Sequence, residues 1–147
     1  MTKIVIGSDH AAFEMKEFVK ELLVLQKIEV LDVGTHSADR CDYPDFATAV
    51  AKVVVDQKIS GILLCGSGIG VSIVANRYKG IRAALCRSAT DAEMSRKHND
   101  ANILCLGART NSKKEIEAII ESWLTYQFEA GRHADRLEKF EKLGESL

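Results

Sequence analysis

Gly61-Ile62-Leu63-Leu64-Cys65-Gly66-Ser67-Gly68-Ile69-Gly70 is the stretch that decides the fold of this chain. Its short aliphatic run is typical of a buried strand, and it leads directly into a cysteine and three alternating glycines. Residues 71–76 have the pattern of a helix opening, and glycine lets the loop backbone approach a ligand closely. A strand, a glycine-rich loop and a helix in this order predict a turn whose backbone N–H groups bind an anion.

Cys65 has two interpretations at this place. At the positively polarised start of a helix a thiol ionises more readily, which would make Cys65 a usable base or nucleophile. It could equally be a buried cysteine at a strand end beside a tight turn. The loop by itself does not separate the two.

Strands alternate with helices along the rest of the chain. Apolar runs at 4–6, 29–33, 61–65, 81–86 and 103–106 have the composition of buried parallel strands. Helical periodicity predicts helices over 12–25, after Pro44 and over 88–98. A capping box at Ser112 opens a long helix that Gly131 can end, and a last helix is expected at about 134–143. This alternation predicts the α/β class: a three-layer α/β/α Rossmann-like sandwich with a five-stranded parallel sheet and a C-terminal helical extension.

Length and composition limit the functions to consider. The chain has 147 residues, of which 46% are hydrophobic, so we expect one domain over residues 1–147. Lys plus Arg (20) nearly balance Asp plus Glu (21), which favours neither nucleic acid nor an anionic membrane as a partner. No segment is typical of a signal peptide or a membrane span, so we expect a soluble cytoplasmic protein.

The four cysteines stand far apart, with no C-x-x-C pair, which indicates reduced thiols and neither disulfides nor a zinc site. Cys86 and Cys105 lie within predicted strands and are expected to be core residues. The glycine loop also fails two nucleotide motifs. A P-loop requires Gly-Lys-Ser/Thr where this chain has Gly70-Val71-Ser72, and the dinucleotide fingerprint requires its third glycine one residue later.

Ligands of parallel sheets bind beyond the carboxyl ends of the strands. The segments there are 7–10, 34–45, 65–70 and 107–109, and they concentrate His, Asp, Cys, Tyr and Gly. Asp9 either caps the first helix or contacts a ligand, and the neighbouring His10 favours contact.

Two basic positions lie elsewhere in the sequence. His98 either complements the dipole of its helix or acts as an acid/base, since imidazole titrates near neutral pH. Arg132 and Arg136, four residues apart, share a helix face that is either solvated or able to grip a phosphate. The residues alone favour a solvated face for this pair.

Several segments together closely resemble the type B ribose-5-phosphate isomerases, whose family also includes galactose-6-phosphate and allose-6-phosphate isomerases. The match extends over nearly the whole chain. The segments are Gly7-Ser8-Asp9-His10, Asp42-Tyr43-Pro44, Cys65-Gly66-Ser67-Gly68-Ile69-Gly70, Ala75-Asn76, Gly80-Ile81-Arg82-Ala83, Ser95-Arg96-Lys97-His98-Asn99-Asp100-Ala101-Asn102 and Gly131-Arg132-His133.

The resemblance implies an aldose-ketose isomerase that interconverts D-ribose 5-phosphate and D-ribulose 5-phosphate through a cis-enediolate, in the non-oxidative pentose phosphate branch, without a metal or other cofactor. Cys65 would be the base at C2, Ser67 would relay a proton between O1 and O2, and His98 would open the furanose ring. The backbone N–H groups that would hold the enediolate belong to Gly66, Ser67, Gly68, Ile69 and Gly70.

The resemblance also implies substrate contacts and a partner. Asp9, Tyr43 and Asn99 would hold hydroxyls. The contacts to the substrate and its phosphate would come from His10, Arg109, Arg132 and Arg136, which reverses the interpretation of the arginine pair. The site would lie at the interface of a homodimer, or of a tetramer, with the last helix packed on the partner subunit.

Two departures and two alternatives accompany the resemblance. Val71 stands where one branch of the family has a glutamate, which leaves Cys65 as the base, and Ser67 stands where many relatives have threonine. A hexose 6-phosphate, galactose 6-phosphate or allose 6-phosphate, is an alternative substrate. A non-catalytic sugar-phosphate sensor is a second alternative, which the joint presence of Cys65, Ser67 and His98 disfavours.

Overall fold

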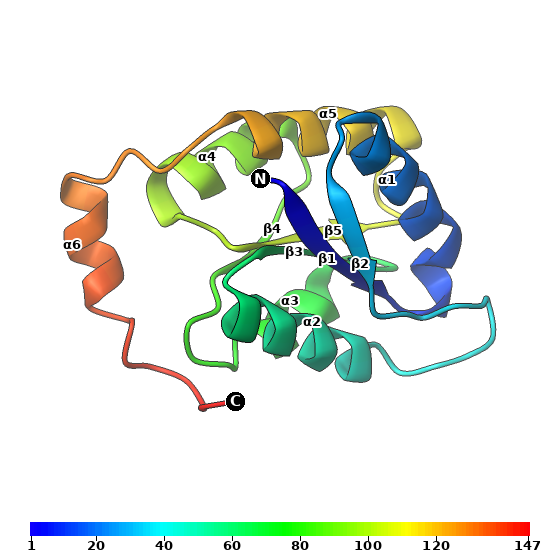
Figure 1. Cartoon of the computed structure of the whole chain (residues 1–147), viewed down its shortest axis with the longest axis horizontal. Helices are drawn as coiled ribbons and strands as arrows, with labels where there is room; N and C mark the ends of the chain where they lie inside the picture. The colour runs from blue at the N-terminus through cyan, green and yellow to red at the C-terminus, as the bar shows by residue number, and fades with distance from the viewer.

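Five parallel strands form the central sheet, in the order β2-β1-β3-β5-β4 (Figure 1). They are β1 (Lys3–Ser8), β2 (Glu29–Asp32), β3 (Ser60–Cys65), β4 (Ala83–Leu85) and β5 (Ile103–Gly107). The computed structural model describes residues 1–147, and every pair of neighbouring strands is parallel. The predicted five-stranded parallel sheet is therefore confirmed.

Helices cover both faces of the sheet (Figure 1). One layer contains α1 (Phe13–Leu25), α4 (Ala89–Asn99) and α5 (Lys113–Thr125), and the other contains α2 (Tyr43–Gln57) and α3 (Ile69–Ala75). A short 3₁₀ helix, η1 (His10–Ala12), precedes α1. The last helix, α6 (Arg132–Glu138), stands apart beyond α4 (Figure 1). The three-layer sandwich with a C-terminal helical extension matches the predicted fold class.

The strands are buried on both faces, as their continuous apolar sequences predict. Along β3, Ile62 and Leu64 pack toward α1 and α5, whereas Leu63 and Cys65 pack toward α2 and α3. Trp123 of α5 is the largest fully buried side chain. Side chains that alternate between two cores explain why the strand sequences show no polar face.

Some predicted element boundaries were wrong. The strand predicted over 81–86 is limited to Ala83–Leu85, and the long helix ends at Thr125 because Tyr126 is extended (φ −90°, ψ 149°). Gly131 does not end that helix but is the N-cap residue of α6, which spans Arg132–Glu138 rather than 134–143. The start at Ser112 was right, because the capping box is a local hydrogen-bonded structure and forms as predicted.

The strand order places a topological switch point between β1 and β3. The chain leaves β1 for β2 on one side and then returns to form β3 on the other side. Ligands of open α/β sheets bind in the crevice that such a reversal creates outside the carboxyl ends of the strands. The Asp9 N–H group donates to the Leu64 carbonyl (3.3 Å), which brings the residue after β1 beside the last residues of β3.

Candidate active site

Cys65 is the last residue of β3, and its sulfur faces the glycine loop. The Gly68 N–H group donates a hydrogen bond to Sγ (3.1 Å), and 5% of the residue's surface is exposed. Gly68 has φ +77°, a conformation that L residues with a side chain rarely adopt. Features of both interpretations of Cys65 therefore occur together. The thiol is largely buried at a strand end, and its sulfur accepts a hydrogen bond from a backbone amide of the loop.

The rest of the loop is arranged by short backbone contacts. Ser67 Oγ accepts from the Ile69 N–H group (3.2 Å), and Ser67 is partly exposed. The carbonyl groups of Cys65 and Gly66 accept from the N–H groups of Ala108 and Arg109, each at 2.9 Å. Residues 108 and 109, which follow β5, thus hold the start of the loop after β3 in place through these two hydrogen bonds.

Two side chains close over the loop. The Tyr43 ring lies so near Gly70 that a Cβ there would be 2.6 Å from Cε2 and Cζ. The Arg109 guanidinium lies against Gly66, where a Cβ would be 3.3 Å from Nη1. Glycine at these positions lets an aromatic hydroxyl and a cation approach the loop backbone closely.

A cavity of about 460 Å³ is lined by Asp9, His10 and residues 40–45, and it adjoins the loop through Tyr43, whose ring lies against Gly70. Asp9 is 7% exposed, and its Oδ1 accepts from the Ala12 N–H group (3.2 Å), so it caps η1. Its contact with a substrate stays a prediction. His10 Nδ1 lies 3.2 Å from both the backbone nitrogen and the carbonyl oxygen of Cys41. The structure therefore gathers Asp9, His10 and Tyr43 around one opening at the carboxyl edge of the sheet.

The remaining predicted site residues lie elsewhere. Helix α4 begins after the carboxyl end of β4 and ends before the amino end of β5 (Figure 1). His98 and Asn99, the last two residues of α4, therefore lie at the opposite edge of the sheet from Cys65, the last residue of β3. Arg132 and Arg136 are exposed on α6, which contacts α4. A single chain therefore does not bring these four residues to the glycine loop.

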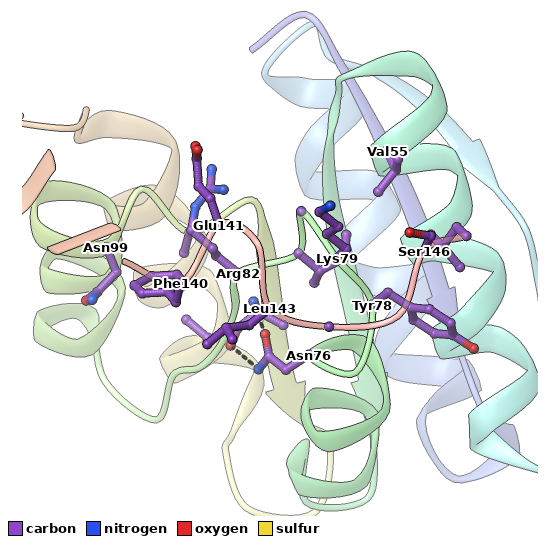
Figure 2. Close-up of a pocket in the computed structure, with 17 residues that line it drawn as sticks. Val55, Asn76, Tyr78, Lys79, Arg82, Asn99, Phe140, Glu141, Leu143 and Ser146 are labelled. Atoms are coloured by element: carbon purple, nitrogen blue, oxygen red, sulfur yellow. Dashed lines mark hydrogen bonds between the residues drawn. The ribbon is translucent and has the colours of Figure 1, made fainter. Parts of the chain in front are cut away.

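Asn99 lines a groove of about 860 Å³ on its side of the molecule (Figure 2). The C-terminal segment forms one wall with Phe140 and Leu143, and Asn76 and residues 78–84 form the other. The segment is held by two backbone hydrogen bonds, from the Lys79 N–H group to the Glu145 carbonyl (2.7 Å) and from the Glu145 N–H group to the Arg77 carbonyl (2.9 Å).

His98 stacks on a histidine to which sequence reasoning assigned no role. Its ring centroid is 4.3 Å from that of His133, with 17° between the planes. Burial, and then the positive charges of His98 and the neighbouring arginines, lower the pKa of His133 below its ordinary value. The sequence did contain a signal for a role of His133, because this histidine directly follows Arg132 in a segment that carries the family resemblance.

His98, Glu129 and His133 bring potential metal-ligand atoms within 4.8 Å of one another. Their surroundings are basic, because the Lys97 ammonium lies 3.1 Å from the Glu129 carboxylate and Arg132 adjoins His133. The carboxylate thus already has a cationic partner, and the cluster suits an anion better than a metal ion.

None of the helices is long and apolar enough to span a lipid bilayer.

Comparison with known proteins agrees with this geometry. The family model described as Ribose/Galactose Isomerase matches residues 4–140. Ribose-5-phosphate isomerase B of Escherichia coli (strain K12) is 43% identical over 139 residues, which cover 94% of this chain and 93% of the relative.

Solved structures show the same similarity. The ribose 5-phosphate isomerase of Thermotoga maritima is 47% identical with a TM-score of 0.94, over 97% of this chain and 99% of the other. Ribose-5-phosphate isomerase B of Mycoplasma genitalium, solved with bound ribulose-5-phosphate, is 39% identical with a TM-score of 0.92, over 95% and 94% of the two chains. The matched motifs, the sheet topology and these similarities establish that this chain belongs to the ribose/galactose isomerase family.

Proposed function

We propose that this chain is a single-domain isomerase that interconverts D-ribose 5-phosphate and D-ribulose 5-phosphate in the non-oxidative pentose phosphate branch. The observation that carries the proposal is the Cys65 sulfur, which lies under the glycine loop and receives the Gly68 N–H group. The similarity to ribose-5-phosphate isomerases, one of them solved with ribulose-5-phosphate, supports the substrate.

Cys65 as a thiolate would remove the proton from C2 of the open-chain aldose. The electron pair of the broken C–H bond then forms the C1–C2 double bond, and the carbonyl electrons move to O1, which gives a cis-enediolate. Backbone N–H groups of residues 66–70 stabilise the negative oxygens, and return of the proton to C1 completes the ketose. Ser67 relays a proton between O2 and O1, because its Oγ accepts from Ile69 and its own hydrogen is free to donate.

The other contacts follow from their places in the fold. Asp9 and Tyr43 hold substrate hydroxyls beside the loop, and Asn99 holds one from the opposite edge. Because the sugar rests mostly as a closed furanose, His98 acts as the acid/base that opens it. The phosphate and the rest of the substrate are contacted by His10, Arg109, Arg132 and Arg136.

The residues around the Cys65 loop and those around His98 lie at opposite edges of a single chain. This separation supports a homodimer, or a tetramer built from such dimers, whose site combines both chains. Ile69 (43% exposed) and Ile73 (56%) form an apolar ridge on α3 next to the catalytic loop. Burying such a ridge against a second copy is favourable, and it would bring the second copy's His98 edge toward Cys65. In this assembly α6 packs on the partner subunit, and we place the enzyme in the cytoplasm.

Exchange of the C2 hydrogen of ribose 5-phosphate with solvent deuterium tests the proposal, with and without a chelator. Cys65→Ala should abolish exchange with little change in substrate affinity, because the thiol acts mainly in the transition state. The matched control is Cys86→Ala, which removes a buried thiol at the end of β4 and should retain turnover. Retention of most turnover by Cys65→Ala would refute the base, and loss of wild-type turnover in the chelator would refute metal independence.

Arg132→Ala and Arg136→Ala should chiefly weaken substrate binding, whereas Lys52→Ala, which removes an exposed cation on α2, should leave binding unchanged. Unchanged affinity in both arginine variants would exclude the phosphate contact. Turnover of galactose 6-phosphate or allose 6-phosphate above that of ribose 5-phosphate would assign the site to a hexose. Sugar-phosphate binding without any exchange would indicate a sensor.

A further inference from the structure

The His98–His133 stack joins two helices that are far apart in sequence. His98 lies in the last turn of α4, and His133 is the second residue of α6. His133 is 7% exposed, whereas His98 is half-buried and keeps part of its surface free. One face of the His98 ring is therefore covered by a buried ring, while part of the His98 residue remains exposed.

The stack is held in place by its surroundings. The Glu129 N–H group donates to the Lys97 carbonyl (3.1 Å), which attaches the segment before α6 to the last turn of α4. The Lys97 ammonium also bridges Glu129 (3.1 Å) and Glu93 (3.2 Å). The His133 N–H group donates to the Ala130 carbonyl (3.2 Å), so the first turn of α6 starts from a fixed connection.

Charge makes His133 unsuitable as a second acid. Its burial, and then the charges of His98, Arg132 and Arg136, lower the pKa of His133, which favours the neutral form of its ring. A neutral flat ring competes little for the proton that His98 must handle. It restricts the plane of His98 by van der Waals contact, and a general acid/base must lie within hydrogen-bond reach of the reacting oxygen.

We propose that His133 is a positioning residue for ring opening: its imidazole fixes the plane of His98 so that His98 can act on the furanose oxygens. This inference rests on the proposed function. In the opening step, the O1 hydroxyl loses its proton, the C1–O4 bond breaks, and O4 gains a proton. One proton leaves the sugar and one returns, so no oxidant or further reactant is needed.

The two sugars separate this step from isomerisation. Ribulose 5-phosphate cannot form a furanose, because its O5 carries the phosphate and no other hydroxyl can close a five-membered ring on C2. Exchange of its C1 hydrogen with solvent deuterium therefore requires Cys65 and the loop but no ring opening. Turnover of ribose 5-phosphate requires both steps.

The experiment compares these two reactions in His133→Ala and His133→Phe. His133→Ala should lower kcat for ribose 5-phosphate about tenfold, a part of the roughly 10²–10⁴-fold contribution of general acid–base catalysis. Its C1 exchange on ribulose 5-phosphate should stay within about twofold of wild type. His133→Phe, which keeps a flat ring without a titratable group, should recover most of the lost turnover. Asp135→Ala, an exposed control on the same helix, should change neither reaction.

Three results would overturn the inference: unchanged turnover in His133→Ala, equal loss of both reactions in His133→Ala, or no recovery in His133→Phe. If His133→Ala does not fold, as judged by circular dichroism, His133→Phe and His133→Asn carry the test. In that case Asn, which lacks a ring, should show the selective loss and Phe should not. Absence of C1 exchange in the wild type would instead refute the proposed function, so the two failures are distinguishable.

Discussion

The ammonium nitrogen of Lys16, a side chain with no exposed surface, lies 2.6 Å from each carboxylate oxygen of Asp32. Lys20 adds a second ion pair to the same carboxylate at 2.8 Å, and the Gly34 N–H group donates to Oδ1 at 2.9 Å. Asp32 ends β2, directly before the loop that leads to Tyr43. This buried pair therefore ties α1 to the start of a loop that lines the candidate site.

Replacing Asp32 with Asn should lower the free energy of unfolding by about 3–5 kcal/mol, because it removes the nearer of the two carboxylates beside the buried Lys16 ammonium and leaves only Glu17, at 3.7 Å. Lys16→Met is the matched control, since it fills similar space without a charge and Asp32 retains Lys20. Urea unfolding of the two variants should show the larger loss for Asp32→Asn. Equal losses in both would contradict an energetic role for the pair.

Acid should weaken the fold partly through the same carboxylate. Burial tends to raise the pKa of Asp32, but hydrogen bonds from Lys16, Lys20 and Gly34 more than offset it and hold the pKa below the ordinary 3.8. A carboxyl whose folded pKa is depressed contributes stability above its unfolded pKa and loses it as pH falls through the folded value. Urea midpoints should therefore decline below about pH 4, and decline less steeply in Asp32→Asn. Parallel declines in the two proteins would exclude Asp32 as a source.

Two glycines with positive φ provide a test of loop packing. A Cβ on Gly68 would meet the Leu106 backbone carbon at 2.9 Å, whereas a Cβ on Gly131 would meet nothing within 4 Å. Gly131 combines φ +61° with ψ −131°, outside the left-handed helical region, so Gly131→Ala should cost about 1–3 kcal/mol of backbone strain. Gly68→Ala should cost clearly more, because it adds a steric clash to the strain. Thermal unfolding measures both. A Gly68→Ala protein as stable as Gly131→Ala would show that the loop can move away from β5.

Two of the four thiols should resist alkylation in the native protein. Burial raises the pKa of Cys86 to about 11 and that of Cys105 well above its usual range. Iodoacetamide at about pH 8 should therefore leave both unmodified until urea is added, since the thiolate is the nucleophile. Cys41, which is partly exposed, should react in the native state. Peptide mapping by mass spectrometry checks the order, and modification of Cys86 before Cys41 would contradict it.

Sequence patterns predicted the elements better than their ends. The capping box at Ser112 identified the start of α5 because its hydrogen bonds lie within four residues. The predicted end of α5 and the predicted length of α6 were wrong, because both depend on contacts that residues 126–131 make with α4. One of these contacts is the hydrogen bond from the Glu129 N–H group to the Lys97 carbonyl. Lys16 occupies an apolar stripe with Ala12 and Val19, which was a visible signal of a buried charge. Its partner, sixteen residues away, was not visible.

The sequence by itself determined the parallel sheet, the glycine loop at Cys65 and the family resemblance, because hydrophobic period and turn chemistry are local properties of the chain. Only the tertiary structure decided which predicted site residues meet. Strand order brings Asp9 and Tyr43 to the Cys65 loop, whereas the direction of α4 carries His98 to the opposite edge and onto His133. Local sequence carries no information on strand order or on which helix ends adjoin, since these follow from packing between distant segments.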